Sequence, residues 1–278
     1  METLLTRAEE LQERLIAWRR TVHRYAEPGG EEHRTAALVE HEAKRLGLPV
    51  IDGGQTSRIA VLDTGRPGKT VLLRADMDAL PVTENPENLR GPRCVLSENP
   101  GFSHACGHDA HTAMLLGAME LLSEMREALT GKLLFCFESD EENGSGWPKL
   151  LPVLENFDID RCFAIHVLSS LEAGRISIQP GGRMSGMVAV DAEFVGRGGH
   201  GSRPDLSVNP VFAAAAALSN LAVAAANRIT PGQVLTLGIK NEALGSGAEH
   251  HNERFDLDEA ALWRGAACYA GFAVEALK

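Results

Sequence analysis

Eight consecutive positions concentrate side chains that bind metals. The stretch from His104 to His111 contains one thiol, three imidazoles and one carboxylate, in the order His-Ala-Cys-Gly-His-Asp-Ala-His. Cys106 and His108 are two residues apart, so both can turn toward one point from an irregular loop. Thiolate and imidazole are ligands for zinc and its divalent neighbours, which makes a metal site the first hypothesis.

Packing and thiol chemistry are the alternatives to a metal site. A single cysteine beside a buried helix is usually a small packed hydrophobe, and a lone histidine is usually a hydrogen-bonded structural residue. The density of Cys106, His108 and their neighbours exceeds what packing needs. A thiol enzyme, with Cys106 as nucleophile and His108 as base, is weaker because such near neighbours suit shared coordination better than a nucleophile–base hydrogen bond.

The segment after this cluster predicts how the cluster is held. The apolar run from Ala110 to Met125 is too long for a strand and predicts a helix that is buried on most sides. The polar residues therefore lie in the loop before a helix N-terminus. There the backbone dipole favours a thiolate over a thiol at Cys106.

Other candidate side chains follow short apolar segments that predict strands. Three such segments end in side chains that could bind a metal or move a proton: Thr70–Arg74 leads to Asp76 and Asp78, Lys132–Glu138 leads to Glu141 and Glu142, and Asp160–His166 ends at His166. In open α/β sheets, ligands bind at the carboxyl ends of the strands. Taken singly, these residues could be helix caps or solvated turns, so the hypothesis depends on their meeting at one edge.

The pattern of apolar and polar residues changes after Gly181-Gly182, which we interpret as a hinge. Met187–Val195 alternates like a strand, Asn209–Asn227 is an Ala-rich helix opened by Pro210, and Gln233–Ile239 predicts another strand. We therefore predict an α/β protein with a mixed central sheet flanked by helices, formed by residues 1–183 and 241–278. A small α+β domain over residues 184–240 is inserted into it.

A glycine-rich stretch in the inserted domain formally matches G-x-G-x-x-G, from Gly196 to Gly201. A dinucleotide site needs a helix opening directly at those glycines, whereas Arg203-Pro204-Asp205 delays the helix here. We therefore reject a nucleotide site and interpret the stretch as a turn that presents His200. On the residues alone, an ordinary exposed turn histidine is an equally good interpretation.

Composition limits the class of protein and its partners. The chain has 278 residues, of which 44% are apolar and 23% charged, as in globular proteins. Its net charge of -11 argues against nucleic acid and anionic membrane surfaces as partners. Five scattered cysteines indicate a reducing compartment, and no targeting or membrane-spanning segment is recognisable. The expected location is the cytoplasm.

These motifs together resemble the M20 family of metallopeptidases, in particular its amidohydrolase branch of hippurate hydrolases, N-acyl-amino-acid amidohydrolases and indole-acetyl-amino-acid hydrolases. The motifs that carry the resemblance occur in the family's order: Arg74-Ala-Asp-Met-Asp-Ala-Leu-Pro81, His104-Ala-Cys-Gly-His-Asp109, the acid pair after Phe137, Ala164-Ile-His166-Val, Gly198-Gly-His-Gly201 and His251-Asn-x-x-Phe255. They cover the chain from roughly Arg20 to its end, which makes the resemblance highly specific.

The resemblance implies a two-metal hydrolase that cleaves small N-acyl or N-aroyl amino acids. It implies five metal ligands, with the first bridging two divalent ions: Cys106, His108, Glu142, His166 and His251. His251 is preferred over His250 because the family places this ligand four residues before the aromatic, here Phe255. Manganese is the expected metal, and zinc, nickel and cobalt also suit these ligands.

The resemblance also implies roles for residues that do not bind metal. Glu141 would be the general base, and Asp76 and Asp78 would orient a ligand imidazole. His200, from the inserted lid domain, would stabilise the oxyanion. A lid of this kind commonly forms dimer contacts in the family, so a homodimer or higher homo-oligomer is expected.

Two departures from the family pattern bear on this prediction. Members of the family are longer, and a large block of their sequence is absent here after Lys240, which leaves a lid of strand, helix and strand. The usual Gln-Pro-Ala before the acid pair is Glu138-Ser-Asp140 in this chain. The alternative function is a non-catalytic metal-binding or assembly module on the same scaffold, made inactive by the shortened lid.

Overall fold

The computed structural model describes residues 2–178, 192–228 and 235–278. The chain forms two compact units, one of Met1–Ile178 with Leu235–Lys278 and the other of Gln179–Val234. Among the described residues, no helix combines the length and the apolar character needed to cross a membrane.

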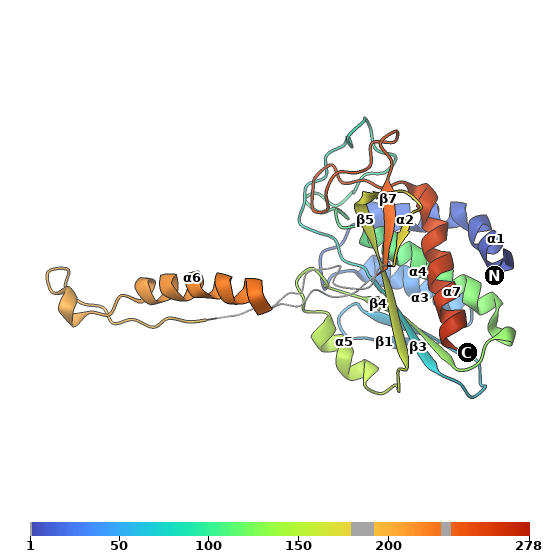
Figure 1. Cartoon of the computed structure of the whole chain (residues 1–278), viewed down its shortest axis with the longest axis horizontal. Coiled ribbons are helices and arrows are strands. Elements are labelled where there is room, and N and C mark those ends of the chain that lie inside the picture. Colours follow the sequence, from blue (N-terminus) through green and yellow to red (C-terminus); the bar gives the residue numbers. More distant parts are fainter. Residues whose placement is uncertain (1, 179–191, 229–234) are drawn as a thin grey trace. The chain divides into compact units, whose positions relative to one another are not determined.

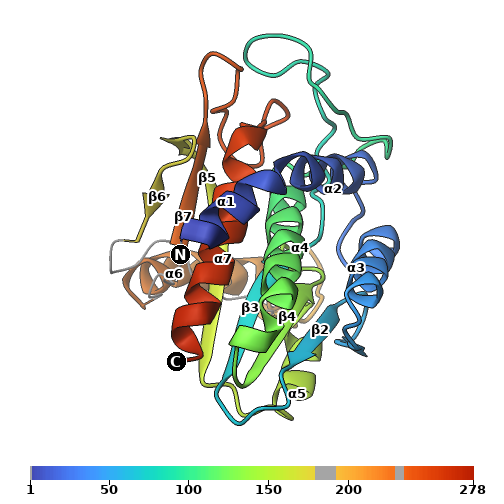
Figure 2. The same cartoon turned by 90° about the vertical axis from the view of Figure 1, so that its right-hand side faces the viewer.

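A mixed sheet of seven strands organises the first unit, in the order β1-β2-β4-β3-β5-β7-β6. The strand labels of Figure 1 and Figure 2 together cover all of them. The strands are β1 (Val50–Asp52), β2 (Arg58–Asp63), β3 (Thr70–Asp76), β4 (Lys132–Glu138), β5 (Arg161–Glu172), β6 (Ile176–Ser177) and β7 (Leu235–Lys240). The four central strands β4, β3, β5 and β7 are parallel, and β1, β2 and β6 are antiparallel to their neighbours. The carboxyl ends of the central strands therefore lie at one edge, and the predicted α/β class with a mixed sheet is confirmed.

Helices cover both faces of this sheet. They are α1 (Glu2–Glu10), α2 (Gln12–Arg24), α3 (His33–Arg45), α4 (His108–Glu124), α5 (Trp147–Leu154) and α7 (Leu262–Ala276), with short 3-10 turns at Arg126–Ala128 and Glu259–Ala261. Helix α4 packs against α2 and α7 on the same face of the sheet (Figure 2). The larger apolar core lies between this helical layer and the sheet, and a smaller cluster lies on the other face beside α5.

The position of α4 explains why its sequence is apolar on every side. All residues from His108 to Leu122 are buried. This agrees with the helix predicted from the apolar run after Cys106. Because the helix is enclosed by the sheet, α2 and α7, its first turn is held rigidly.

Strand β7 differs from its expected place. The sequence suggested that residues 233–239 belong to the lid, whereas Leu235–Lys240 lies in the main sheet, parallel to β5. Leu237 and Ile239 are fully buried in the larger core. A strand that is buried on both faces is typical of the inside of a parallel sheet, which is the physical reason for this correction.

The described part of the second unit comprises residues 192–228. It contains a bridge between Arg197 and Val208, a 3-10 turn at Pro204–Leu206 and helix α6 (Pro210–Arg228). Helix α6 confirms the predicted Ala-rich helix. Of the strand expected over residues 187–195, residues 187–191 lie outside the described residues, and residues 192–195 form no regular structure. The boundaries and the lid role of this domain stay predictions.

Candidate metal centre

The expected polar residues meet at the carboxyl edge of the central strands. Strands β3 and β4 run in register so that Asp76 pairs with Glu138, and β5 pairs with β3 on its other side. The loops after β3 and β4 carry Asp78, Glu141 and Glu142 beyond this edge. The convergence on which the metal hypothesis depended is therefore present.

A glycine brings the cysteine loop against this edge. Gly107 caps α4 with a φ of +90°, and a Cβ placed there would lie 2.5 Å from a methyl carbon of Val167. Any larger residue would clash and would have to adopt a left-handed conformation. As a result, the Sγ of Cys106 lies 3.5 Å from the Nε2 of His166 on β5.

All five expected ligand residues contribute to one cluster. Two groups of potential ligands share Cys106, and within each group the ligand atoms lie within 4.8 Å of one another. The first group, here called the buried half, is Cys106, His108 and His166. The second group, here called the turn half, is Cys106, Glu142 and His251. The Oε1 of Glu142 lies 3.6 Å from the Nε2 of His108 and 3.4 Å from the Nε2 of His251. The two halves together are called the candidate centre.

Hydrogen bonds on the outer side of two imidazoles leave their inner nitrogens available. The Nδ1 of His108 lies 3.1 Å from the Oδ1 of Asp78, and the Nδ1 of His166 donates to the carbonyl of Val167 at 2.6 Å. Each ring therefore turns its Nε2 toward the cluster. The Nε2 of His108 and the Oε1 of Glu142 are buried without a hydrogen-bond partner among the described residues. Bound cations would satisfy both atoms, so these side chains fit a metal site.

The electrostatics of the cluster also favour a cation. Burial lowers the pKa of His108, but the negative charge of Asp76 and the hydrogen bond to Asp78 outweigh it and raise that pKa well above its ordinary value. Burial raises the pKa of Cys106 to about 11, although His108 opposes the shift. Without a metal, this pKa favours a thiol at Cys106. A bound metal ion would deprotonate it, so the thiolate expected from the sequence stays a prediction for the metal-bound protein. A buried thiol with this pKa also argues against a thiol enzyme.

Glu141 lies beside the cluster and differs from its neighbours in exposure and in the causes of its pKa shift. Its Oε2 is 3.9 Å from the Nε2 of His108, and its side chain is 40% exposed. Partial burial and the nearby charge of Asp76 raise the pKa of Glu141 to about 7. Its carboxyl group can therefore both accept and donate a proton near neutral pH.

His111 belongs to the same network and was not assigned a role from the sequence. Its Nδ1 lies 2.6 Å from the Oδ1 of Asp76, and its Nε2 accepts the backbone N–H of Val167 at 2.9 Å. It forms a further candidate group with Asp76 and His108, but both its nitrogens are already engaged. Its position one helical turn after His108 was the available signal. His111 instead fixes the backbone next to His166.

The remaining expected residues fall into two cases. His251 is part of the turn half, as expected, while the Nε2 of its neighbour His250 accepts the backbone N–H of Ser169 at 3.3 Å. Burial and the charge of His111 lower the pKa of His250 to about 4, so this ring is neutral. His200 belongs to the second unit, where its Nδ1 lies 2.8 Å from the hydroxyl of Ser202. Its catalytic role stays a prediction.

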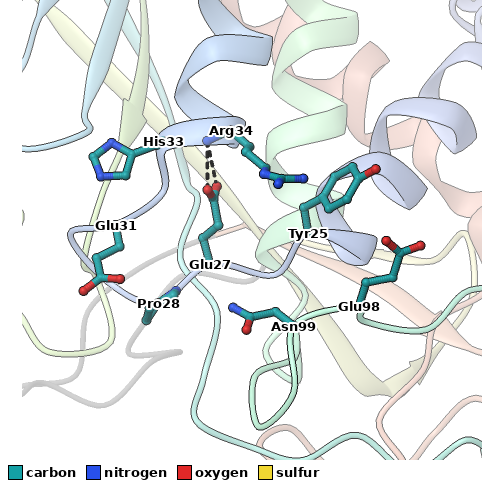
Figure 3. A pocket seen from close by; sticks show the side chains of 8 residues that line it. All are labelled: Tyr25, Glu27, Pro28, Glu31, His33, Arg34, Glu98 and Asn99. Carbon is teal, nitrogen blue, oxygen red and sulfur yellow. Dashed lines mark hydrogen bonds between the residues drawn. The ribbon is translucent and has the colours of Figure 1, made fainter.

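A separate pocket of about 480 Å³ lies at the start of α3 (Figure 3). Its wall includes Glu27, whose carboxylate accepts the backbone N–H groups of Arg34 and Thr35. The guanidinium of Arg34 lies 4.4 Å from the ring centre of Tyr25. These side chains are engaged in capping and packing, and the residues that line the pocket include none of the expected site residues.

Comparison with solved structures supports the fold. A protein from methicillin-resistant Staphylococcus aureus aligns over 100% of both chains with a TM-score of 0.84 and 21% identity. A Bacillus subtilis protein described as a dinuclear metal binding peptidase from the M20 family aligns over 96% of this chain and 98% of its own, with a TM-score of 0.72 and 21% identity.

Comparison of sequences gives a family and relatives. The model of the family described as Peptidase family M20/M25/M40 matches residues 72–275. An N-acyl-L-amino acid amidohydrolase of Geobacillus stearothermophilus is 34% identical over 86% of this chain and 64% of its own length. Thermostable carboxypeptidase 1 of Saccharolobus solfataricus is 33% identical over 93% of this chain and 67% of its own. An IAA-amino acid hydrolase of Arabidopsis thaliana is 38% identical over 78% of this chain and 49% of its own length. The chain thus spans about half to two thirds of the length of these relatives.

Proposed function

The chain belongs to peptidase family M20/M25/M40, and we propose that it is a metal-dependent amidohydrolase that cleaves small N-acyl or N-aroyl amino acids. The observation that carries this proposal is the convergence of two ligand groups on Cys106. The buried Nε2 of His108 and Oε1 of Glu142, which have no hydrogen-bond partner in the part of the chain that the structure describes, support it further. The names of the relatives, which include an N-acyl-L-amino acid amidohydrolase and an IAA-amino acid hydrolase, motivate the substrate class.

We propose that the centre would hold two divalent ions, with Cys106 as a ligand common to both positions. His108 and His166 would complete one position, and Glu142 and His251 the other. Such ions lower the pKa of water and polarise the scissile carbonyl. Manganese is our proposal for the metal; zinc, nickel and cobalt are chemically compatible with the same thiolate, imidazole and carboxylate ligands.

The proposed proton transfers depend on Glu141. Its carboxylate would take a proton from the attacking water and return it to the leaving amine, which requires a pKa close to the working pH. In the metal-free chain, burial and the charge of Asp76 raise the pKa of Glu141 to about 7, which supports this role. Asp78 would hold the His108 ring through Nδ1. His200 would donate to the developing oxyanion, a contribution of roughly 3 kcal/mol where such a donor has been removed in other enzymes.

The oligomeric state and the location come from the sequence alone. We propose a homodimer or a higher homo-oligomer in the cytoplasm, acting on a small molecule rather than on nucleic acid or a membrane. Light scattering of the purified protein tests the first part, and a mass equal to one chain would contradict it.

Metal-dependent hydrolysis tests the proposed function directly. The purified protein is stripped with a chelator, supplied separately with manganese, zinc or cobalt, and incubated with hippurate and a panel of N-acetyl amino acids. We expect amino acid release only after metal is restored. Bound metal without turnover on the whole panel would instead support the non-catalytic module. Hydrolysis that persists without metal would support the thiol enzyme.

A further inference from the structure

The turn that carries His251, residues 250–255, is the least buried source of ligands in the candidate centre. The His251 side chain is 52% exposed, and its backbone has a φ of +62°. A left-handed conformation is disfavoured for a residue with a Cβ, so surrounding contacts must hold it. One contact is the backbone N–H of His251, which donates to the carbonyl of Ala105 at 2.8 Å. This bond holds only the beginning of the turn.

A buried arginine holds the other end of the turn. Arg93 comes from the long loop between β3 and α4, and its side chain is 1% exposed. Its Nη1 donates to the carbonyl of Phe255 at 2.6 Å and its Nη2 to the carbonyl of Glu253 at 2.9 Å. Its Nε donates to the carbonyl of Asn85 at 2.8 Å, and Glu84 balances the charge at 3.3 Å. One guanidinium therefore ties the His251 turn to the loop.

The same arginine is connected to the other side of the centre. Glu84, its ion-pair partner, lies 2.8 Å from the Nε2 of His23 on α2. The Nδ1 of His23 lies 2.8 Å from Asp109, the residue after His108 in the first turn of α4. A continuous buried series of charged groups thus joins the segment that carries one ligand to the turn that carries another, although the two are far apart in the sequence.

We propose that Arg93 is a positioning residue for the turn half of the candidate centre. By binding two carbonyls of the turn in one plane, it holds His251 at a distance from Cys106 and Glu142 at which all three can share an ion. A lysine could not replace it, because an ammonium lacks the planar set of donors that reaches three carbonyls at once. This inference rests on the proposed metal centre and adds a residue that touches neither metal nor substrate.

Metal titration of Arg93 variants tests this role. Apoprotein is titrated with manganese alone, and bound metal is counted by elemental analysis, for the wild type, Arg93→Ala and Arg93→Lys. We expect one ion to bind as in the wild type and the other to bind at least about tenfold more weakly, as when groups that orient a metal ligand are removed. His251→Ala should weaken the same ion. Guanidinium at low millimolar concentration should restore the second ion to Arg93→Ala but not to His251→Ala, and a merely structural role would not predict this difference.

Arg90 provides a matched control in the same loop. It is exposed, and its Nε donates to the carbonyl of Glu242 at 2.8 Å, outside the His251 turn. Arg90→Ala should therefore bind both ions normally. If Arg93→Ala does not fold, the metal affinities of Arg93→Lys test the role of Arg93 instead. This variant keeps a positive charge beside Glu84 and so leaves no unpaired carboxylate there.

The possible results separate this inference from the proposed function. A wild-type protein that binds no metal would overturn both. A wild type with two ions and Arg93→Lys with the same two affinities would overturn the role of Arg93 alone. Equal loss of both ions in Arg93→Lys, with a folded chain by circular dichroism, would also contradict a role confined to the turn half.

Discussion

His108 and His251 offer imidazole nitrogens to the same cluster, yet one side chain is 1% exposed and the other 52%. His108 starts a helix that is enclosed by the core, and a carboxylate fixes its Nδ1. His251 lies on a left-handed turn that is held through backbone carbonyls. The two halves of the centre therefore present similar ligands with very different support.

This difference predicts an order of binding. The buried half has little conformational freedom to lose, so it should bind an ion with a smaller entropic cost than the turn half. The turn half borders solvent, because the His251 side chain is 52% exposed. Substitutions in and around the two halves should therefore affect the two ions differently, except at Cys106, which the halves share.

Cys106→Ala should produce the largest effect because the thiol belongs to both ligand groups. We expect loss of both ions and a fall in hydrolysis on the order of 10⁴-fold or more, since bound metal is what makes water nucleophilic at neutral pH. Elemental analysis and hippurate hydrolysis measure the two effects. Cys136→Ala is the control, because this buried cysteine lies in the smaller core on β4. Retention of both ions in Cys106→Ala would remove the cysteine from the centre.

Glu141→Gln should separate chemistry from metal binding. The amide cannot take a proton from water, so kcat should fall by about 10²- to 10⁴-fold while both ions stay bound. Glu127→Gln is a suitable control, since that side chain is 91% exposed and lies in the turn after α4. An unchanged kcat would show that another group acts as the base.

The buried half was easier to predict from the sequence than its surroundings. Cys106 and His108 are close in sequence, and polar residues after apolar strands mark the carboxyl edge of a parallel sheet. The fold class followed from the same alternation of strands and helices. Such local patterns are visible without any knowledge of tertiary contacts.

What the sequence could not show depends on contacts between distant segments. Strand β7 was assigned to the lid because the pattern of the sequence changes after Gly181-Gly182, but pairing with β5 places it in the main sheet. The pKa of Cys106 depends on its burial, which raises the pKa and which the sequence alone does not show. Arg93 gave no signal, because its partners at Glu253 and Phe255 are backbone carbonyls with no sequence pattern.

Asp78→Asn should sharpen the comparison, because this carboxylate touches both halves. Its Oδ1 lies 3.1 Å from the Nδ1 of His108, and its Oδ2 accepts the backbone N–H of Glu142 at 3.0 Å. We expect metal affinity to fall by about 10- to 100-fold at the buried half, where the His108 ring loses the negative charge of its partner, and less at the turn half. Manganese titration measures this, with Asp63→Asn at the opposite end of the sheet as control. An equal loss at both positions would mean that the halves do not bind independently.

His23→Gln should have the smallest effect on activity and should appear instead in the dependence of stability on pH. His23 links the halves, because it lies between Asp109 beside His108 and Glu84 beside Arg93. Burial and the charge of Arg19 lower the pKa of His23, but the hydrogen bonds to Asp109 and Glu84 outweigh them and raise it above its ordinary value. Since the pKa is higher in the folded chain, the charged ring stabilises the fold fully below about pH 6.5, the value in unfolded chains.

That stabilisation is lost as the pH rises through the folded pKa of His23. The melting temperature of the metal-free wild type should therefore fall on going from pH 6 toward pH 9, and this part of the fall should be absent in His23→Gln. Keeping the protein metal-free separates this change from protons released by the ligands. His41→Gln, on the exposed surface of α3, controls for the loss of an imidazole. If the melting temperatures of the wild type and His23→Gln change with pH in parallel, His23 does not titrate between pH 6 and pH 9. Any pH dependence of metal binding would then have to come from the ligands themselves.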